Sequence, residues 1–232
     1  MKTPTLVVSP AGRNNLFVES HITNLMNNGD LEFSRGSFAH SLDRDSKWFE
    51  EAIDSPRFNY PKHATRPSIL FEPQRTNYIV STEKFDTVST PWNSSSTGTG
   101  LAPVIVDNYG TFQGVPTSRI TFEVGALDNA SRSYIQQTMS GVTLTIQSVW
   151  ARTVDGSNVT CTMLGGGANG TVVTGEWQQF TLIESGAGFR IGILDTGSES
   201  PSRLVDLELC MPMATEGSYP TSYIPTSGSS VT

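Results

Sequence analysis

The chain has 232 residues, of which 36% are hydrophobic and only 16% are charged, and its formal net charge is −7. Low charge with abundant Gly, Ser, Thr, Asn and Pro favours many short strands and disfavours helical bundles and disorder. An acidic chain without a basic patch is a poor match for nucleic acid, and no segment approaches the roughly 18 apolar residues of a membrane span. Neutral or cationic partners, or other proteins, are therefore expected, without nucleic-acid binding or membrane insertion.

Two segments without strong periodicity precede the main part of the chain. Residues 1–30 contain a turn-rich stretch around Asn28-Gly29 and predict an N-terminal arm or attachment segment, without the apolar core of a secretory signal. Residues 31–84 hold short apolar runs bounded by prolines, such as PRFNYP and SILFEP. Because proline is confined to strand ends and edges, these runs predict a small β-rich unit made of hairpins.

Residues 85–214 show a clear two-residue alternation. Ile120, Phe122 and Val124 alternate with polar residues, as half-buried strands of an antiparallel sheet do. Other alternating sets are Leu144, Ile146, Ser148 and Trp150; Val159, Cys161 and Met163; and Val205, Leu207, Leu209 and Met211. We therefore predict an all-β fold, an antiparallel jelly-roll β-sandwich with a small N-terminal hairpin-rich unit and extended terminal arms. Residues 215–232, rich in Ser, Thr, Pro and Gly, are expected to form an extended C-terminal strap.

The sequence offers little for catalysis or metal binding. It contains no nucleophile elbow, HExxH, P-loop or CxxC motif. Cys161 and Cys210 lie in apolar alternating runs, which favours buried free thiols, with a disulfide between adjacent strands as the alternative. Two cysteines and three scattered histidines are too few for a metal site. No cofactor, metal or catalytic residue is predicted, and a structural Ca²⁺ is not indicated.

Aromatic residues beside amides are the best candidates for a binding site. Sugar rings stack their C–H faces on Trp or Tyr, while Gln, Asn and Arg bind their hydroxyl groups. Tyr134 and Gln136 fall on one face of the predicted strand RSYIQQTM, Trp177 opens EWQQF, and Trp92 precedes a Ser/Thr/Gly loop. These four residues are predicted to line a concave glycan-binding face, with the alternative that Trp177, like Trp150, fills the sandwich core.

The stretch ILFEPQRTNYIV at 69–80 places Glu72 and Arg75 on either side of Pro73 and Gln74. Because proline cannot donate to a ladder, Pro73 is expected to end the strand that Ile69 begins. We interpret Glu72 and Arg75 as a structural ion pair across a tight turn, with Arg57 as a third member, rather than as an active-site pair.

Several motifs also occur in a recognisable order. SPRFNY (55–60), ILFEPQRTNYI (69–79), QQTMSGVTLTIQSVWAR (136–152), TGEWQQFTL (174–182) and the segment 207–232 follow one another along the chain. Their order resembles a module in virion proteins of tailed bacteriophages, over roughly residues 33–232. The first thirty residues have no counterpart in that module.

The resemblance implies a jelly roll similar to carbohydrate-binding modules, as found in tail fibres, tail spikes and head fibres. It implies a virion structural protein, assembled in the bacterial host cytoplasm, that adheres to host-surface or environmental polysaccharide and contacts other virion proteins. The resemblance also implies a homo-oligomer, which is expected to be a trimer. Two alternatives stay open: a structural adaptor with the same fold and no glycan, and a polysaccharide-degrading enzyme.

Overall fold

A computed structural model describes residues 39–52, 55–60, 68–69, 75–128, 130–139, 141–142, 144–165, 170–185, 188–194 and 202–231. The chain divides into two compact units, Met1–Phe71 and Glu72–Thr232, which are considered separately below. Within the described residues no helix is long and apolar enough to span a membrane. The predicted arm at 1–30 lies outside the described residues.

The described residues of the first unit form two short antiparallel strand pairs. β1 (Ala39–Leu42) pairs with β2 (Trp48–Glu51), and β3 (Phe58–Asn59) pairs with β4 (Ser68–Ile69). The Asp43 carboxylate closes the β1–β2 turn, because its Oδ1 accepts from the backbone N–H of Asp45 at 2.8 Å and of Lys47 at 2.9 Å. Both described strand pairs of this unit are antiparallel, which is compatible with the predicted β-rich unit.

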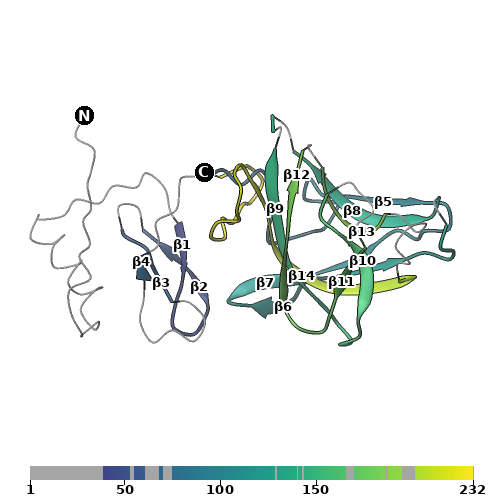
Figure 1. Cartoon of the computed structure of the whole chain (residues 1–232), viewed down its shortest axis with the longest axis horizontal. Helices are drawn as coiled ribbons and strands as arrows, with labels where there is room; N and C mark the ends of the chain where they lie inside the picture. Colours follow the sequence, from purple (N-terminus) through teal and green to yellow (C-terminus); the bar gives the residue numbers. More distant parts are fainter. Residues whose placement is uncertain are drawn as a thin grey trace, which may run out of the picture. The chain divides into compact units, whose positions relative to one another are not determined.

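In the second unit the described residues form two five-stranded antiparallel sheets (Figure 1). The first, named the β8 sheet here, has the order β11-β10-β13-β8-β5. Its strands are β11 (Gly170–Val173), β10 (Val159–Met163), β13 (Gly188–Ile193), β8 (Arg132–Thr138) and β5 (Asn93–Thr97). The second, the β14 sheet, has the order β12-β9-β14-β7-β6. Its strands are β12 (Gln178–Glu184), β9 (Thr145–Thr153), β14 (Leu204–Thr215), β7 (Val115–Glu123) and β6 (Val104–Phe112).

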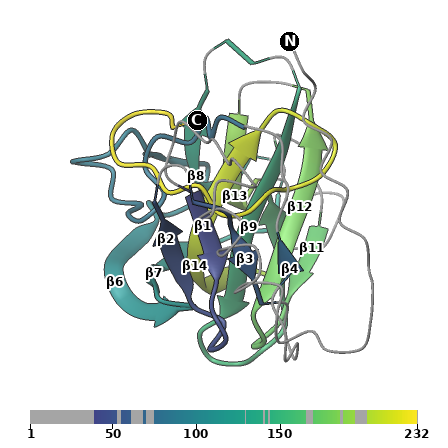
Figure 2. The same cartoon turned by 90° about the vertical axis from the view of Figure 1, so that its left-hand side faces the viewer.

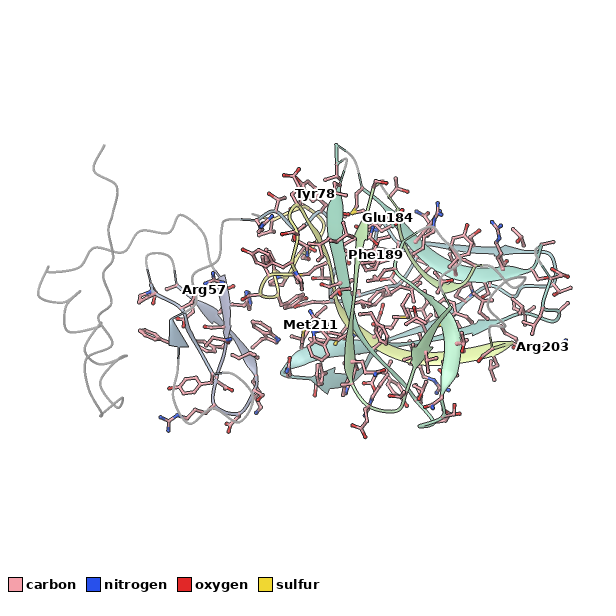
Figure 3. The ribbon with its side chains drawn as sticks, viewed as in Figure 1. Arg57, Tyr78, Glu184, Phe189, Arg203 and Met211 are labelled. Carbon is pink, nitrogen blue, oxygen red and sulfur yellow. The ribbon has the colours of Figure 1, made fainter. Side chains whose placement is uncertain are left out.

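The chain passes repeatedly from one sheet to the other, so most neighbours in a sheet are distant in sequence. β8 lies beside β13, and β14 lies between β7 and β9. Side chains from both sheets fill the space between them, with Phe189 near the middle (Figure 3). The predicted jelly-roll β-sandwich is therefore confirmed.

The alternating residues of β7 and β14 form the centre of the core. Ile120, Phe122 and Leu207 are all fully buried and belong to one hydrophobic cluster with residues of the β8 sheet such as Ile135 and Ile191. Burial of each large aliphatic or aromatic side chain contributes about 1.5–3 kcal/mol. The two-residue period correctly predicted which residues of these two strands face the core.

Strand β9 directs toward the core cluster the face opposite to the one that the sequence pattern favoured, although Ile146 and Ser148 of the favoured face are also buried. Val149 and Ala151 belong to the core cluster, whereas Trp150 lies on the outer face of the sheet and is half-buried. Gln147 lies on the same face as Val149 and Ala151, where it is fully buried with both ends of its amide hydrogen-bonded. Its Nε2 donates to the carbonyl of Gly188 at 2.8 Å, and its Oε1 accepts from the N–H of Gly165 at 3.1 Å. A satisfied amide can occupy a core position that hydrophobicity alone would not assign to it.

A bulge interrupts the pairing of β14 with β9 between Cys210 and Met213. Met211 has a φ of 54°, and Pro212 follows it. Proline lacks an N–H group for the ladder and is therefore tolerated within a bulge. The bulge ends the simple alternation that the sequence predicted to extend from Val205 to Met211.

Residues 75–84 belong to the sandwich, which moves the boundary predicted at 84/85 to 71/72. The N–H of Tyr78 donates to the carbonyl of Ala214 at 2.9 Å, and Ile79 is fully buried. The C-terminal strap pairs with the same segment, through bridges Asn77–Val231 and Ser81–Ser227. In Figure 2 the strap, coloured yellow, runs in wide loops across one end of the sandwich. These contacts hold the strap against the domain.

Candidate functional site

The outer face of the β8 sheet brings two of the predicted site residues together. On β8 the side chains of Ser133, Ile135 and Gln137 are at most 1% exposed and point into the sandwich. Because side chains alternate along a strand, Tyr134 and Gln136 point to the opposite face, where both are half-buried. Their predicted position on one common face is borne out by this register.

The neighbouring strands surround these two residues with small and polar side chains. In the ladder Tyr134 lies opposite Ser95 of β5 and Gly192 of β13, while Gln136 lies opposite Asn93 and Arg190. Directly opposite residues in an antiparallel pair share a face, with Cβ atoms about 4.5–5.5 Å apart. One tyrosine, two amides and a guanidinium therefore converge on one patch of the sheet, here named the Tyr134 face.

Gly192 keeps one flank of Tyr134 clear. Its φ is 141°, and a Cβ at this position would lie 2.4 Å from the carbonyl oxygen of Ser133 and 2.8 Å from the Cβ of Tyr134. Any larger residue would clash there and would adopt an unfavourable backbone conformation. The phenol ring thus has only the small Ser95 and a glycine as direct cross-strand neighbours, which suits a stacking platform.

Arg190 organises the polar part of the face. Its Nε donates to Oε1 of Gln136 at 3.1 Å. Because this contact occupies the acceptor oxygen of the Gln136 amide, the NH₂ group of the amide points away from Arg190 and can donate to another group. Arg190 was not among the predicted residues, although its place between Phe189 and Ile191 in GFRIGIL already indicates an outward side chain.

Trp92 is a core residue, which removes it from the candidate binding residues. Its side chain is 1% exposed and packs against Phe85 at 4.9 Å and Phe189 at 5.7 Å between ring centroids. The indole Nε1 donates to the carbonyl of Ser81 at 2.8 Å. The adjacent Asn93, one residue further along the chain, is the exposed residue that reaches the Tyr134 face.

Trp177 lies with the other sheet, away from Tyr134. Its ring stacks on Phe112 of β6 at 4.2 Å and 20°, and the guanidinium of Arg152 on β9 lies 5.1 Å from the ring centroid. Phe112 also contacts Trp150 at 5.2 Å. The two predicted tryptophans therefore do not complete a site with Tyr134 and Gln136.

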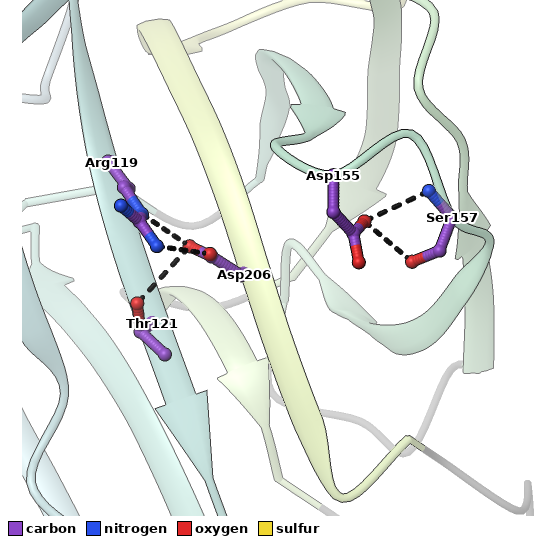
Figure 4. Close-up of polar contacts among 5 residues, drawn as sticks. All are labelled: Arg119, Thr121, Asp155, Ser157 and Asp206. Carbon is purple, nitrogen blue, oxygen red and sulfur yellow. Dashed lines mark hydrogen bonds and ion pairs between the residues drawn. The ribbon is translucent and has the colours of Figure 1, made fainter.

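On the outer face of the β14 sheet, arginines and carboxylates form cross-strand pairs. Arg119 binds both oxygens of Asp206, at 3.0 and 2.7 Å, and Thr121 donates to the same carboxylate (Figure 4). Arg152 pairs with Glu208 at 2.6 Å. Figure 4 also shows Asp155 closing its own turn by accepting from Ser157. These carboxylates are engaged in holding strands and turns together.

The predicted ion pair of Glu72, Arg75 and Arg57 stays a prediction, because Glu72 lies outside the described residues. Arg75 packs against the strap. Its guanidinium lies 5.5 Å from the ring centroid of Tyr219, and a Cβ at Gly217 would fall 1.9 Å from its Nη1. The stretch that contains Arg75 thus contacts the C-terminal strap, in keeping with a structural role.

Both cysteines are free and buried, and they lie on different sheets, Cys161 on β10 and Cys210 on β14. Burial raises the pKa of the Cys161 thiol to about 12. Burial, and then the nearby Glu208 carboxylate, raise the pKa of Cys210 as well. Since the thiolate is the reactive form, neither residue is placed to act as a nucleophile. The described residues contain no group of three or more His, Cys, Asp or Glu that could hold a metal ion.

Comparisons with known proteins found no matching family model and no matching curated protein. Three of the solved structures that match this chain are similar to it only at a low level. A family 11 carbohydrate-binding module from Clostridium thermocellum, in complex with a β-1,3-1,4-mixed-linked tetrasaccharide, is 6% identical with a TM-score of 0.39, covering 67% of this chain and 99% of that one. A structure of carbohydrate-binding modules from the β-sandwich superfamily is 10% identical with a TM-score of 0.35, covering 78% and 86%.

The third structure is the enzymatically active domain of tailspike protein 4 from bacteriophage CBA120. It is 12% identical with a TM-score of 0.35, covering 60% of this chain and 21% of that one. This chain therefore corresponds to about a fifth of the tailspike domain. No residue's role is transferred from any of the three structures at these similarities.

Proposed function

We propose that the chain binds polysaccharide through the Tyr134 face, as a structural protein of a bacteriophage virion. The observation that carries the binding proposal is the convergence of Tyr134, Gln136 and Arg190 on one outer face of the β8 sheet, where Gly192 adds no side chain opposite the tyrosine. An aromatic ring for the C–H face of a sugar and donors for its hydroxyl groups are the two requirements of such a site.

The chemistry supports weak binding at each site. One aromatic stacking contact is worth roughly 0.5–1.5 kcal/mol beyond buried area, and each neutral hydrogen bond adds about 0.5–1.5 kcal/mol. Several copies presented together raise the overall avidity without new contacts. The homotrimer that the sequence predicts would supply such copies, and the binding target would be a host-surface or environmental polysaccharide.

Binding is favoured over catalysis by the charges on the two sheets. Most glycosidases need two carboxyl groups roughly 5–10 Å apart beside the scissile bond. No Asp or Glu lies on the described part of the Tyr134 face, where the outward residues of β5, β8 and β13 are Asn, Ser, Thr, Arg, Tyr, Gln and Gly. On the β14 sheet Asp206 and Glu208 are bound to arginines. The sandwich therefore supports a binding module rather than a polysaccharide-degrading enzyme.

The virion part of the proposal is supported by the order of motifs from SPRFNY to the C-terminal strap, which resembles a bacteriophage virion module. In this role the protein would be assembled in the bacterial host cytoplasm and would contact other virion proteins. A fibre or a decoration protein on the capsid or tail fits the resemblance equally.

A structural adaptor without glycan binding is the second candidate. The observation in its favour is an exposed apolar group on the outer face of the β14 sheet, comprising Val104 at 61%, Val106 at 47% and Leu204 at 54% exposure. Val104 of β6 lies opposite Thr121 of β7, and Thr121 lies opposite Asp206 of β14. Leu204 is two residues before Asp206 on β14 and therefore shares its face. Apolar residues gathered in this way suit contact with another protein.

Replacement of Tyr134 by alanine separates the two candidates. On an array of bacterial polysaccharides, the wild-type chain is expected to bind, and Tyr134→Ala is expected to bind about tenfold more weakly because it loses a stacking contact of roughly 1.4 kcal/mol. The matched control is Tyr109→Ala, which removes a 43% exposed tyrosine from the other sheet and should leave binding unchanged. Absence of binding by the wild-type chain would favour the adaptor, and release of reducing sugar would establish an enzyme.

A further inference from the structure

Among the described residues of the Tyr134 face, arginines occur without carboxylates. Arg132 is exposed two residues before Tyr134 on β8, and Arg190 lies opposite Gln136 on β13. Side chains at 132, 134 and 136 share one face because they are spaced by two residues along a strand. Both guanidinium groups therefore belong to the same face as the tyrosine.

The arginines on the outer face of the β14 sheet differ from Arg132 and Arg190 in having carboxylate partners. There Arg119 and Arg152 are each paired with a carboxylate, Asp206 and Glu208. On the Tyr134 face the described cross-strand neighbours are Thr97 opposite Arg132, and Gln136 opposite Arg190. These partners are neutral, so the positive charge of the two arginines is not balanced by an acidic neighbour in the ladder.

This local charge is opposite in sign to the charge of the whole chain. With 22 acidic and 15 basic residues the protein is net negative, from which neutral or cationic partners were expected. At physiological ionic strength the Debye length is about 8 Å, so a bound group senses mainly the charges of its own face. The ligand class is therefore better judged from Arg132 and Arg190 than from the net charge.

We propose that the polysaccharide bound by this face is acidic and carries carboxylate groups, as uronic acid residues do. The inference rests on the proposed glycan binding and specifies its ligand class. A sugar ring lies on Tyr134, and ring carboxylates accept hydrogen bonds from the guanidinium groups of Arg190 and Arg132. The planar fork of an arginine matches a carboxylate in two parallel hydrogen bonds, which are stronger than bonds to neutral hydroxyl groups.

The spacing of the two arginines fits an extended sugar chain. Arg190 lies opposite Gln136 of β8, and Gln136 is four residues from Arg132 on the same strand. At 3.3 Å per residue, this separation is about 13 Å along β8. Tyr134 lies midway between Arg132 and Gln136. A polysaccharide running along β8 would thus meet a guanidinium on each side of the stacking ring, so that more than one acidic residue of the same chain is recognised.

The test uses the intact protein and pairs of polymers that differ only in charge. Polygalacturonate, alginate and hyaluronate are each compared with their own carboxyl-reduced form by calorimetric titration. At least one acidic polymer is expected to bind, and at least tenfold more tightly than its reduced form. Arg132→Gln is expected to weaken binding of the acidic polymer about tenfold, and Arg190→Gln is expected to weaken binding of the acidic polymer about tenfold more than binding of its reduced form.

Arg203→Gln is the matched control, because Arg203 is exposed and precedes β14 of the other sheet (Figure 3). Thermal unfolding of each variant should match the wild type, which excludes misfolding as the cause. Equal binding of acidic and reduced polymers, or binding of the reduced forms alone, would overturn the acidic ligand class and leave glycan binding intact. No binding of any polymer, acidic or reduced, would remove both proposals.

Discussion

Replacement of Trp92 by alanine is expected to lower the free energy of unfolding by roughly 3–5 kcal/mol, as truncation of a fully buried aromatic residue does. The indole is 1% exposed and lies between Phe85 and Phe189, so its removal leaves a cavity bounded by other rings. It also leaves the carbonyl of Ser81 without its donor at 2.8 Å. Ser81 forms a β-bridge with Ser227 of the C-terminal strap, so loss of the hydrogen bond from Trp92 is expected to destabilise the strap as well.

Two further variants make this prediction specific. Trp92→Phe retains most of the aromatic body and loses the hydrogen bond, and should be destabilised by about 1–3 kcal/mol. Trp177→Ala, at a half-buried position stacked on Phe112, should lower stability less than Trp92→Ala. Urea unfolding followed by fluorescence and circular dichroism gives all three values. A Trp92→Ala protein of unchanged stability that fails to bind glycan would restore Trp92 as a ligand residue.

The second large effect is expected at Asn77, which connects three segments through one fully buried amide. Its Oδ1 accepts from the N–H groups of Ile79 at 3.2 Å and Ala214 at 3.1 Å, and its Nδ2 donates to the carbonyl of Ile224 at 2.8 Å. Asn77→Ala leaves these backbone groups unsatisfied in the interior. Each buried group without a partner costs about 1–3 kcal/mol, so the loss should be on the order of 3 kcal/mol.

The position of Asn77 also predicts where the damage appears. Because its amide donates to Ile224, the strap should become a target for limited proteolysis in Asn77→Ala while the sandwich strands stay protected. The control is Asn158→Ala, which removes an exposed amide and should change stability by less than 0.5 kcal/mol. Equal stability of the Asn77→Ala and wild-type proteins would show that the strap is not held through this residue.

The architecture could be predicted from the sequence because half-buried strands carry a strong two-residue signal. Ile120, Phe122, Leu207 and Leu209 alternate with polar residues and are all buried in the core. The signal failed at β9, where a buried Gln147 replaces an apolar side chain and the apolar Trp150 lies outside the core. Local hydrophobicity cannot reveal that the amide of Gln147 finds its partners in Gly165 and Gly188, which are distant in sequence.

The candidate site was predictable only where its residues share one strand. Tyr134 and Gln136 are two residues apart, so the alternation alone places them on a common face. Arg190 and Gly192 reach them through the pairing of β13 with β8, and no sequence pattern specifies which strands are neighbours in a jelly roll. Trp92 was misassigned for a related reason, because an aromatic residue beside an exposed strand is compatible with either face until its packing partners are known.

The stretch ILFEPQRTNYIV shows the same limit. The ion pair of Glu72 and Arg75 stays a prediction, and the described residues add that Asn77 and Arg75 contact the C-terminal strap, about 140 residues further along the chain. Such contacts depend on the path of the strap across the sandwich. They make this stretch the point where the beginning and the end of the sandwich are joined.

The central claim, that the outer face of the β8 sheet binds glycan, is tested most directly by nuclear magnetic resonance of the ¹⁵N-labelled protein. The amide signals are followed during titration with an oligosaccharide cut from the polymer that binds best. The largest shift changes are predicted in β5, β8 and β13, around Ser95, Tyr134, Gln136 and Arg190, and they should be absent in Tyr134→Ala. Changes confined to β6, β7, β9 and β14, or no changes at saturating oligosaccharide, would contradict the account.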